Sequence, residues 1–212
     1  EFGDDRGDAV REELGIAEDG LAVCVMGSFN YAEKLDVIYG WVLLEALAEL
    51  DDDTPVVGVL IGGGEDTDYL ERRIAELGIE DRVVMTGHVD HDDLPDYLGA
   101  MDVSMLVKPD HPADKMTTTM KLPEYLAAGT YFVGDDHAYA STILDPEKAS
   151  LLPYEGLKDT SFPPRVAEEL AALAEDPERV AAGKAHSREV AARVFDYEML
   201  RERIAAELER HA

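Results

Sequence analysis

The chain has 212 residues, with 47 Asp or Glu against 19 Lys or Arg, so its formal net charge at pH 7 is -28. Hydrophobic residues still make up 46% of it, which excludes an acidic disordered tail and indicates a folded core beneath an acidic surface. A negative field of this size repels phosphate backbones and anionic membranes, so nucleic acid is not expected as a partner. Few lysines and abundant Asp are typical of proteins from halophilic archaea, with an ordinary acidic cytoplasmic protein as the alternative.

Short apolar runs predict β-strands at 21–26, 56–61, 82–86, 102–107, 131–133 and 150–152. The run at 56–61 is apolar on both faces, as a central strand of a parallel sheet must be. Apolar residues at helical spacing predict helices at 37–48, between Asp66 and Gly78, and at 94–100. This alternation predicts an α/β protein with a doubly wound parallel sheet over about residues 18–155, whose ligands bind at the carboxyl ends of its strands.

After Pro163 the pattern turns helical, and about residues 160–210 are expected to form a C-terminal helical segment of one domain that spans 1–212. Cys24 lies in the first apolar run, so it is expected in the core and not as a nucleophile or metal ligand. No apolar run approaches the roughly 20 residues that cross a bilayer, and no signal peptide opens the chain. We therefore expect a cytoplasmic protein.

The most informative segment is 121–135, Lys-Leu-Pro-Glu-Tyr-Leu-Ala-Ala-Gly-Thr-Tyr-Phe-Val-Gly-Asp. It predicts a short helix with Lys121 and Glu124 one turn apart, ended by Gly129 in the left-handed conformation and followed by a strand. A cation and a carboxylate at a helix start would face the same ligand. The alternative is a helix that only packs on the sheet and leaves both polar side chains in water.

This segment resembles the K-x-x-E-Y-[LM]-A-x-G-x-x-V motif of family-4 glycosyltransferases, the retaining enzymes of the GT-B fold. Further segments resemble that family in the same order over about residues 8–210, including the loop after the first strand and the closing helices. The resemblance implies a Rossmann-like half of such an enzyme, which binds a nucleoside diphosphate sugar for transfer of a hexosyl group to an unknown acceptor. It also implies a missing N-terminal half that binds the acceptor. The fragment would be inactive without that half, and any membrane contact would be made by it alone.

The resemblance assigns Glu124 to the ribose hydroxyls and Lys34 to the phosphates of the donor, and we expect these two residues to be catalytic. Independently, a diphosphate needs cations and amide donors, and the helix start at Thr119, Met120 and Lys121 offers both. Electrostatic stabilisation of the leaving diphosphate by the two lysines and the helix amides would supply most of the catalysis.

The remaining candidate residues lie in loops that follow strands. Gly27 and Ser28 form the first loop, while Gly62 and Gly63 either let the backbone approach the ligand or only make a tight turn. The family's base-binding loop corresponds to Val89 and His88, although a loop histidine can also be exposed and inert.

Three positions depart from the family pattern. Met116 stands where many members carry a second Glu that meets the donor sugar, so the sugar contact would pass to Asp110, Asp114 or amides at 117–119, or the sugar would differ. Ser28 stands where an Arg is frequent, and Leu35 where a Gly is usual.

No cofactor or essential metal is expected. The acidic clusters lack the Cys and His spacing of a zinc site, and the resemblance implies a GT-B enzyme, a class that works without an essential metal. A non-catalytic nucleotide-binding or regulatory domain of the same fold remains the alternative function. A response-regulator receiver is disfavoured, since Gly27-Ser28 and Gly62-Gly63 stand at the strand ends where it needs acidic residues.

Overall fold

The computed structural model describes residues 4–33, 36–108, 119–136 and 138–210. Within them, six parallel strands form one sheet in the order β5-β4-β1-β6-β7-β8. The strands are β1 (Leu21–Met26), β4 (Val56–Ile61), β5 (Val83–Gly87), β6 (Val103–Leu106), β7 (Tyr131–Asp135) and β8 (Ser150–Leu152). From β1 the chain adds β4 and β5 on one side of the sheet, and it then crosses back to add β6, β7 and β8 on the other side. The doubly wound topology is thus confirmed, and its switch point lies at the carboxyl ends of β1 and β6.

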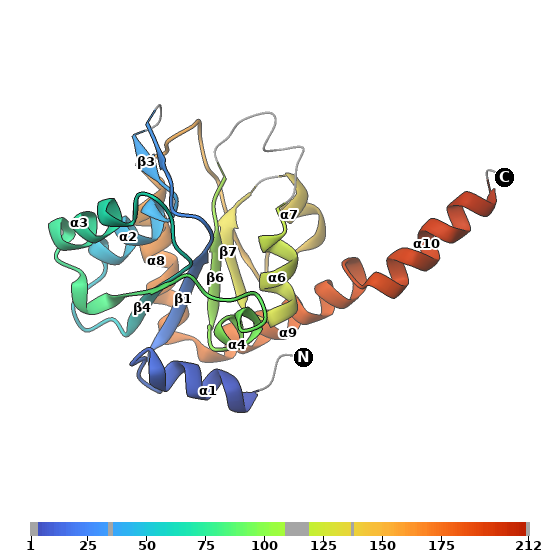
Figure 1. Cartoon of the computed structure of the whole chain (residues 1–212), viewed down its shortest axis with the longest axis horizontal. Coiled ribbons are helices and arrows are strands. Elements are labelled where there is room, and N and C mark those ends of the chain that lie inside the picture. Colours follow the sequence, from blue (N-terminus) through green and yellow to red (C-terminus); the bar gives the residue numbers. More distant parts are fainter. Residues whose placement is uncertain (1–3, 34–35, 109–118, 137, 211–212) are drawn as a thin grey trace.

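Helices cover both faces of the sheet (Figure 1). They are α1 (Asp4–Glu13), α2 (Trp41–Glu49), α3 (Thr67–Leu77), α4 (Leu94–Gly99), α6 (Lys121–Ala128), α7 (Ala138–Ile143), α8 (Phe162–Glu175), α9 (Pro177–Val194) and α10 (Tyr197–Arg210), with a 3-10 turn at Glu80–Arg82. Alternate residues of β1 enter two separate cores, because successive side chains of a strand point to opposite faces. Val23 and Val25 pack with α2, α3 and α8, whereas Cys24 packs with α4, α6 and α9.

The predicted strands and the short helix of the central motif are confirmed. Helix α6 begins at Lys121 and ends at Gly129, whose φ of 75° is left-handed. Gly78 likewise ends α3 in the left-handed conformation. Cys24 is fully buried, and burial raises the pKa of its thiol, in keeping with a core role.

The predicted helix at 37–48 is wrong in its first turn. Val37–Ile38 forms β3, which pairs with β2 (Tyr31–Ala32) in a small antiparallel hairpin, and α2 starts only at Trp41. Asp66 does stand at the N-cap of α3 but does not cap it with its side chain. Its Oδ2 instead accepts a 2.7 Å hydrogen bond from the amide of Tyr31, which ties the hairpin to the body.

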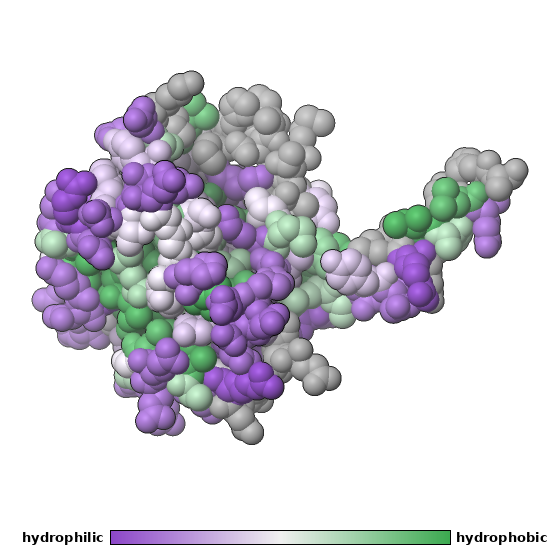
Figure 2. All heavy atoms as spheres, in the orientation of Figure 1, coloured by the Kyte–Doolittle hydropathy of each residue, from purple (hydrophilic) through white to green (hydrophobic). Residues whose placement is uncertain are grey.

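The C-terminal segment is helical as predicted. Helix α8 packs on α2, α9 packs on α6 and β7, and α10 projects away from the body (Figure 1). Hydrophilic side chains cover much of the face seen in Figure 2, while hydrophobic ones reappear on α10, where Ile204 and Leu208 are 61% and 67% exposed. No helix among the described residues is long and apolar enough to cross a membrane. That residues 1–212 form a single domain stays a prediction.

Candidate functional site

The end of β1 and the start of α6 meet at the switch point of the sheet. The Met26 amide donates a 2.7 Å hydrogen bond to the hydroxyl of Tyr125, which is fully buried on α6. Lys121 then lies directly over the loop after β1. A Cβ at Gly27 would sit 2.8 Å from Lys121 Cε and 2.9 Å from Nζ, so the end of the lysine side chain packs directly on this glycine.

Lys121 is a partly buried cation at a position that is electrostatically unfavourable for a positive charge. It is the first residue of α6, where the helix dipole opposes a positive charge. Burial lowers the pKa of its ammonium group, the nearby Lys108 lowers it further, and Glu124 acts against both. No described carboxylate forms an ion pair with it; its ammonium lies 4.4 Å from the centre of the Tyr39 ring. A cation kept in such surroundings is suited to an incoming anion.

Glu124 lies one turn further along α6 and is half-buried. Burial raises the pKa of its carboxyl group, against the opposing fields of His91 and Lys121. Its carboxylate takes no hydrogen bond from a described residue, so it is available to ligand hydroxyl groups. The structure thus brings together the cation and the carboxylate that the sequence motif placed one turn apart.

The glycines after β4 pack tightly against the loop after β1. Gly62 has a φ of 124°, donates its amide to the Gly87 carbonyl at 3.1 Å, and would place a Cβ only 2.2 Å from the Gly27 carbonyl oxygen. A Cβ at Gly64 would lie 2.2 Å from the Phe29 carbonyl oxygen. Contact between the two loops therefore accounts for both glycines. A ligand contact at Gly62 or Gly63 stays a prediction.

The loop after β5 completes the same edge. A Cβ at Gly63 would lie 3.8 Å from the His88 amide nitrogen, so these two loops are neighbours. The His88 ring is 86% exposed, with Nε2 3.7 Å from Asp90, and Val89 is partly buried against the core that contains Leu122. The base contact assigned to Val89 and the role of His88 both stay predictions.

The structure describes only some of the other predicted site residues. Ser28 is exposed, Thr119 is partly buried, and Met120 is 66% exposed at the N-cap of α6. The side chain of the N-cap residue Met120 does not cap α6. The remaining candidates lie outside the described residues, namely Lys34, Leu35, Asp110, Asp114, Met116 and 117–118.

Two residues of this edge escaped the sequence analysis. Lys108 follows β6, is only 8% exposed, and lies close enough to Lys121 to lower its pKa. Its amide donates a 2.9 Å hydrogen bond to Asp135 Oδ1. Its place just after a predicted strand at the switch point was a usable signal. Tyr39 gave no such signal, because its segment fits helical spacing.

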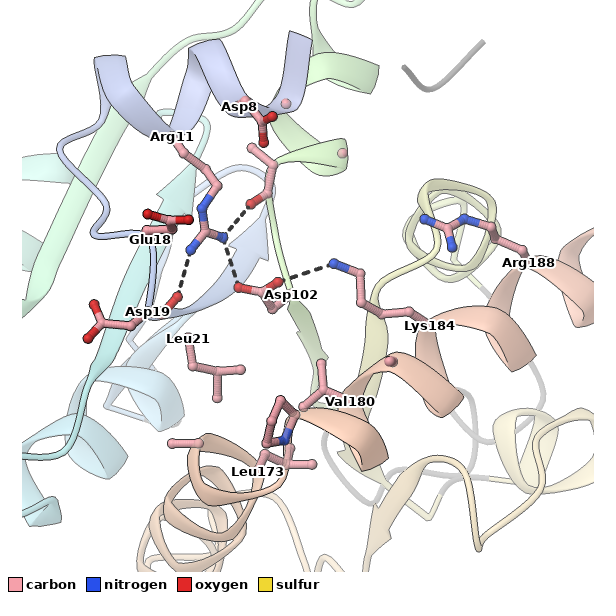
Figure 3. A pocket seen from close by; sticks show the side chains of 17 residues that line it. Asp8, Arg11, Glu18, Asp19, Leu21, Asp102, Leu173, Val180, Lys184 and Arg188 are labelled. Atoms are coloured by element: carbon pink, nitrogen blue, oxygen red, sulfur yellow. Dashed lines mark hydrogen bonds and ion pairs between the residues drawn. The ribbon is translucent and has the colours of Figure 1, made fainter. Parts of the chain in front are cut away.

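A hollow of about 610 Å³ lies at the opposite end of the sheet, between α1 and α9 (Figure 3). Arg11 and Lys184 both reach Asp102 there, at 2.8 and 3.1 Å. Burial would raise the pKa of Asp102, but Lys184, the Ala22 amide and Arg11 together hold it below its usual value. The shared carboxylate of Asp102 joins α1 and α9 to the start of β6, which gives this charged cluster a structural role.

Metal ligation has no support in the described residues, among which no three His, Cys, Asp or Glu side chains are grouped as a metal site needs. That the protein works without metal or cofactor stays a prediction.

The sequence matches the family model described as glycosyl transferases group 1 over residues 8–185. The chain belongs to this family. No curated protein sequence matches it significantly.

Solved structures show the same fold as this glycosyltransferase domain. Anabaena HepE in complex with UDP has a TM-score of 0.76 at 19% identity, over 97% of this chain and 53% of HepE. WaaG, a glycosyltransferase involved in lipopolysaccharide biosynthesis, has a TM-score of 0.69 at 19% identity, over 94% of this chain and 50% of WaaG. The C-terminal domain of LpcC from Francisella tularensis has a TM-score of 0.67 at 14% identity, over 91% and 93%. The chain thus spans about half the length of HepE, with the Rossmann-like fold of GT-B glycosyltransferases.

Proposed function

We propose that the chain is the nucleotide-sugar donor-binding domain of a retaining glycosyltransferase of family 4. The observation that carries the proposal is Lys121, a partly buried cation at a helix N-terminus that no described carboxylate neutralises. The chain has 47 acidic residues, so a lysine at the switch point that forms no ion pair with any described carboxylate indicates a site for an external anion.

The donor diphosphate would lie across the first loop and the start of α6. Lys121 and the amides of Ser28 and of the first turn of α6 would bind its oxygens and stabilise the charge that develops as the sugar leaves. Lys34 is retained as a second candidate cation. Glu124 would accept hydrogen bonds from the ribose hydroxyls, and Val89 would contact the base. HepE has been solved with UDP, which makes UDP the first donor nucleotide to test.

The acceptor would bind to a second half that pairs with this domain, because the chain corresponds to about half of HepE. The acidic composition supports a halophilic, cytoplasmic enzyme, and the chemistry proposed here needs no metal.

Nucleotide binding tests the proposal against a domain without a donor site. In molar potassium chloride, UDP and UDP-glucose should raise the melting midpoint of the 212-residue chain, and uridine without phosphates should not. Sugar transfer by the chain alone should be absent, because the acceptor side of the closed site is missing. Failure of UDP, GDP, ADP and their sugars to bind would remove the proposal, and robust transfer by this chain alone would contradict the need for a second half.

The affinity for UDP should depend on pH through the two charged residues in the first turn of α6. Glu124 has a pKa raised above 4.5, so its carboxylate is lost at a higher pH than that of an ordinary Glu. Lys121 has a pKa lowered below 10.5, so its positive charge is lost at a lower pH than that of an ordinary Lys. Affinity should therefore fall on both the acidic and the alkaline side, as calorimetric titration can measure.

Matched variants separate these effects from the titration of UDP itself, whose terminal phosphate has a pKa of about 6. Glu124→Gln should flatten the acidic limb that remains after that correction, and Lys121→Met should flatten the alkaline limb. Unchanged limbs in both variants would show that neither residue contacts the nucleotide.

A further inference from the structure

We propose that Tyr39 is the positioning residue of the donor site, whose ring face holds the Lys121 ammonium group over the loop after β1 without neutralising it. This inference rests on the proposed donor site and adds a residue to it. The ammonium nitrogen lies 4.4 Å from the centre of the Tyr39 ring. The ring also borders Gly27, since a Cβ there would lie 3.2 Å from Tyr39 Cε1 and 2.9 Å from Lys121 Nζ.

The surrounding residues fix the Tyr39 ring from several sides. It stacks on the fully buried Phe29, with ring centres 6.1 Å apart and planes inclined by 25°. Its edge lines an apolar cavity of about 180 Å³, to which Val25 and Met105 also contribute. A ring held by a buried neighbour offers a face of constant orientation to the lysine.

The Tyr39 hydroxyl is buried and has no hydrogen-bond partner among the described residues. Burial raises the pKa of the Tyr39 hydroxyl, and the neighbouring Tyr125 hydroxyl acts against this shift. Because the hydroxyl forms no hydrogen bond with Lys121, whose ammonium group faces the ring, the proposed role belongs to the ring alone. Phenylalanine should therefore perform it as well as tyrosine.

An aromatic ring has an advantage over a carboxylate as the partner of this lysine. A carboxylate would neutralise the ammonium group and compete with the donor phosphates, whereas a ring attracts the cation through its quadrupole and leaves the net charge in place. The arrangement orients one lysine without pairing it with a carboxylate, in a chain with a net charge of -28. The first loop and the helix start can then share one anion.

A double-mutant cycle on UDP binding tests this role. Tyr39→Phe should bind UDP within about twofold of the parent, and Tyr39→Leu should bind it about three- to tenfold more weakly. In a Lys121→Met background, the same Tyr39→Leu change should have almost no further effect, because the ring acts through the lysine. An equal loss in both backgrounds, or equal affinities of the Phe and Leu variants, would overturn the proposal.

Proton NMR of the ligand-free chain provides a readout that does not depend on donor binding. The ring should shift the Lys121 ε-methylene protons upfield in the parent and in Tyr39→Phe, with the signal assigned by its loss in Lys121→Met. Tyr39→Leu, or Tyr39→Met if the leucine variant does not fold, should return the signal to the ordinary lysine position. If the parent shows an ordinary position, the ring does not hold the lysine and the proposal is wrong. If UDP fails to bind while the upfield shift is present, the proposed function fails and the contact stands.

Discussion

Replacement of Glu124 by alanine should weaken UDP binding by roughly ten- to a hundredfold. Hydrogen bonds from ribose hydroxyls to a carboxylate are charge-assisted, and the loss of about 1.5–3 kcal/mol corresponds to this factor. The unliganded protein should keep its melting midpoint. Burial raises the pKa of Glu124 in the folded state, so its ionised carboxylate destabilises the folded state at neutral pH. Its removal therefore takes no stabilising charge from the fold.

Glu168→Ala is the control for this experiment, since Glu168 is exposed on α8, which packs on α2 and not on α6. This variant should bind UDP like the parent. Isothermal titration gives the affinities, and thermal unfolding without ligand gives the stabilities. If Glu124→Ala binds like the parent, or if it unfolds the domain, the carboxylate is structural and the ribose assignment is wrong.

Stability should rise strongly with salt. The formal net charge of -28 leaves most surface carboxylates without a cationic partner, and their mutual repulsion is screened as the Debye length falls from about 10 Å at 0.1 M to about 3 Å at 1 M salt. Relief of several kcal/mol would raise the melting midpoint by on the order of 10 °C for a chain of this size. Thermal unfolding from 0.1 to 2 M potassium chloride measures the effect, and chloride avoids the general stabilisation that sulfate gives.

Asp52→Asn combined with Asp53→Asn tests the cause of the salt dependence. Both residues are exposed in the turn before β4, so the double variant removes two charges without touching the core. It should be more stable than the parent at low salt and should show a smaller rise with salt. A flat profile for the parent would remove the halophilic interpretation.

The sheet was predictable because its strands are short apolar runs, and the central strands β1, β4, β6 and β7 are buried almost throughout, as a parallel sheet covered on both faces requires. The hairpin was not predictable, since Val37 fits the helical spacing of Trp41 and the deciding contacts are distant. Asp66, 35 residues away from Tyr31, accepts the amide that fixes β2. Tertiary contacts of this kind have no signal within a local window.

The site was predictable only where its residues lie close together in the sequence. The motif at 121–135 placed Lys121 and Glu124 one turn apart on a helix, and the structure confirms that placement. It could not show that Tyr39 lies beneath Lys121 or that Lys108 lies near it, because the three come from different elements brought together only at the switch point.

A crystal structure of the chain soaked with UDP tests most directly whether the donor nucleotide binds at the carboxyl edge of the sheet. We expect the ribose hydroxyls on the Glu124 carboxylate, the diphosphate between Lys121 and the Ser28 amide, and the base beside Val89. UDP seated in the hollow between α1 and α9, or bound with its ribose away from Glu124, would contradict it.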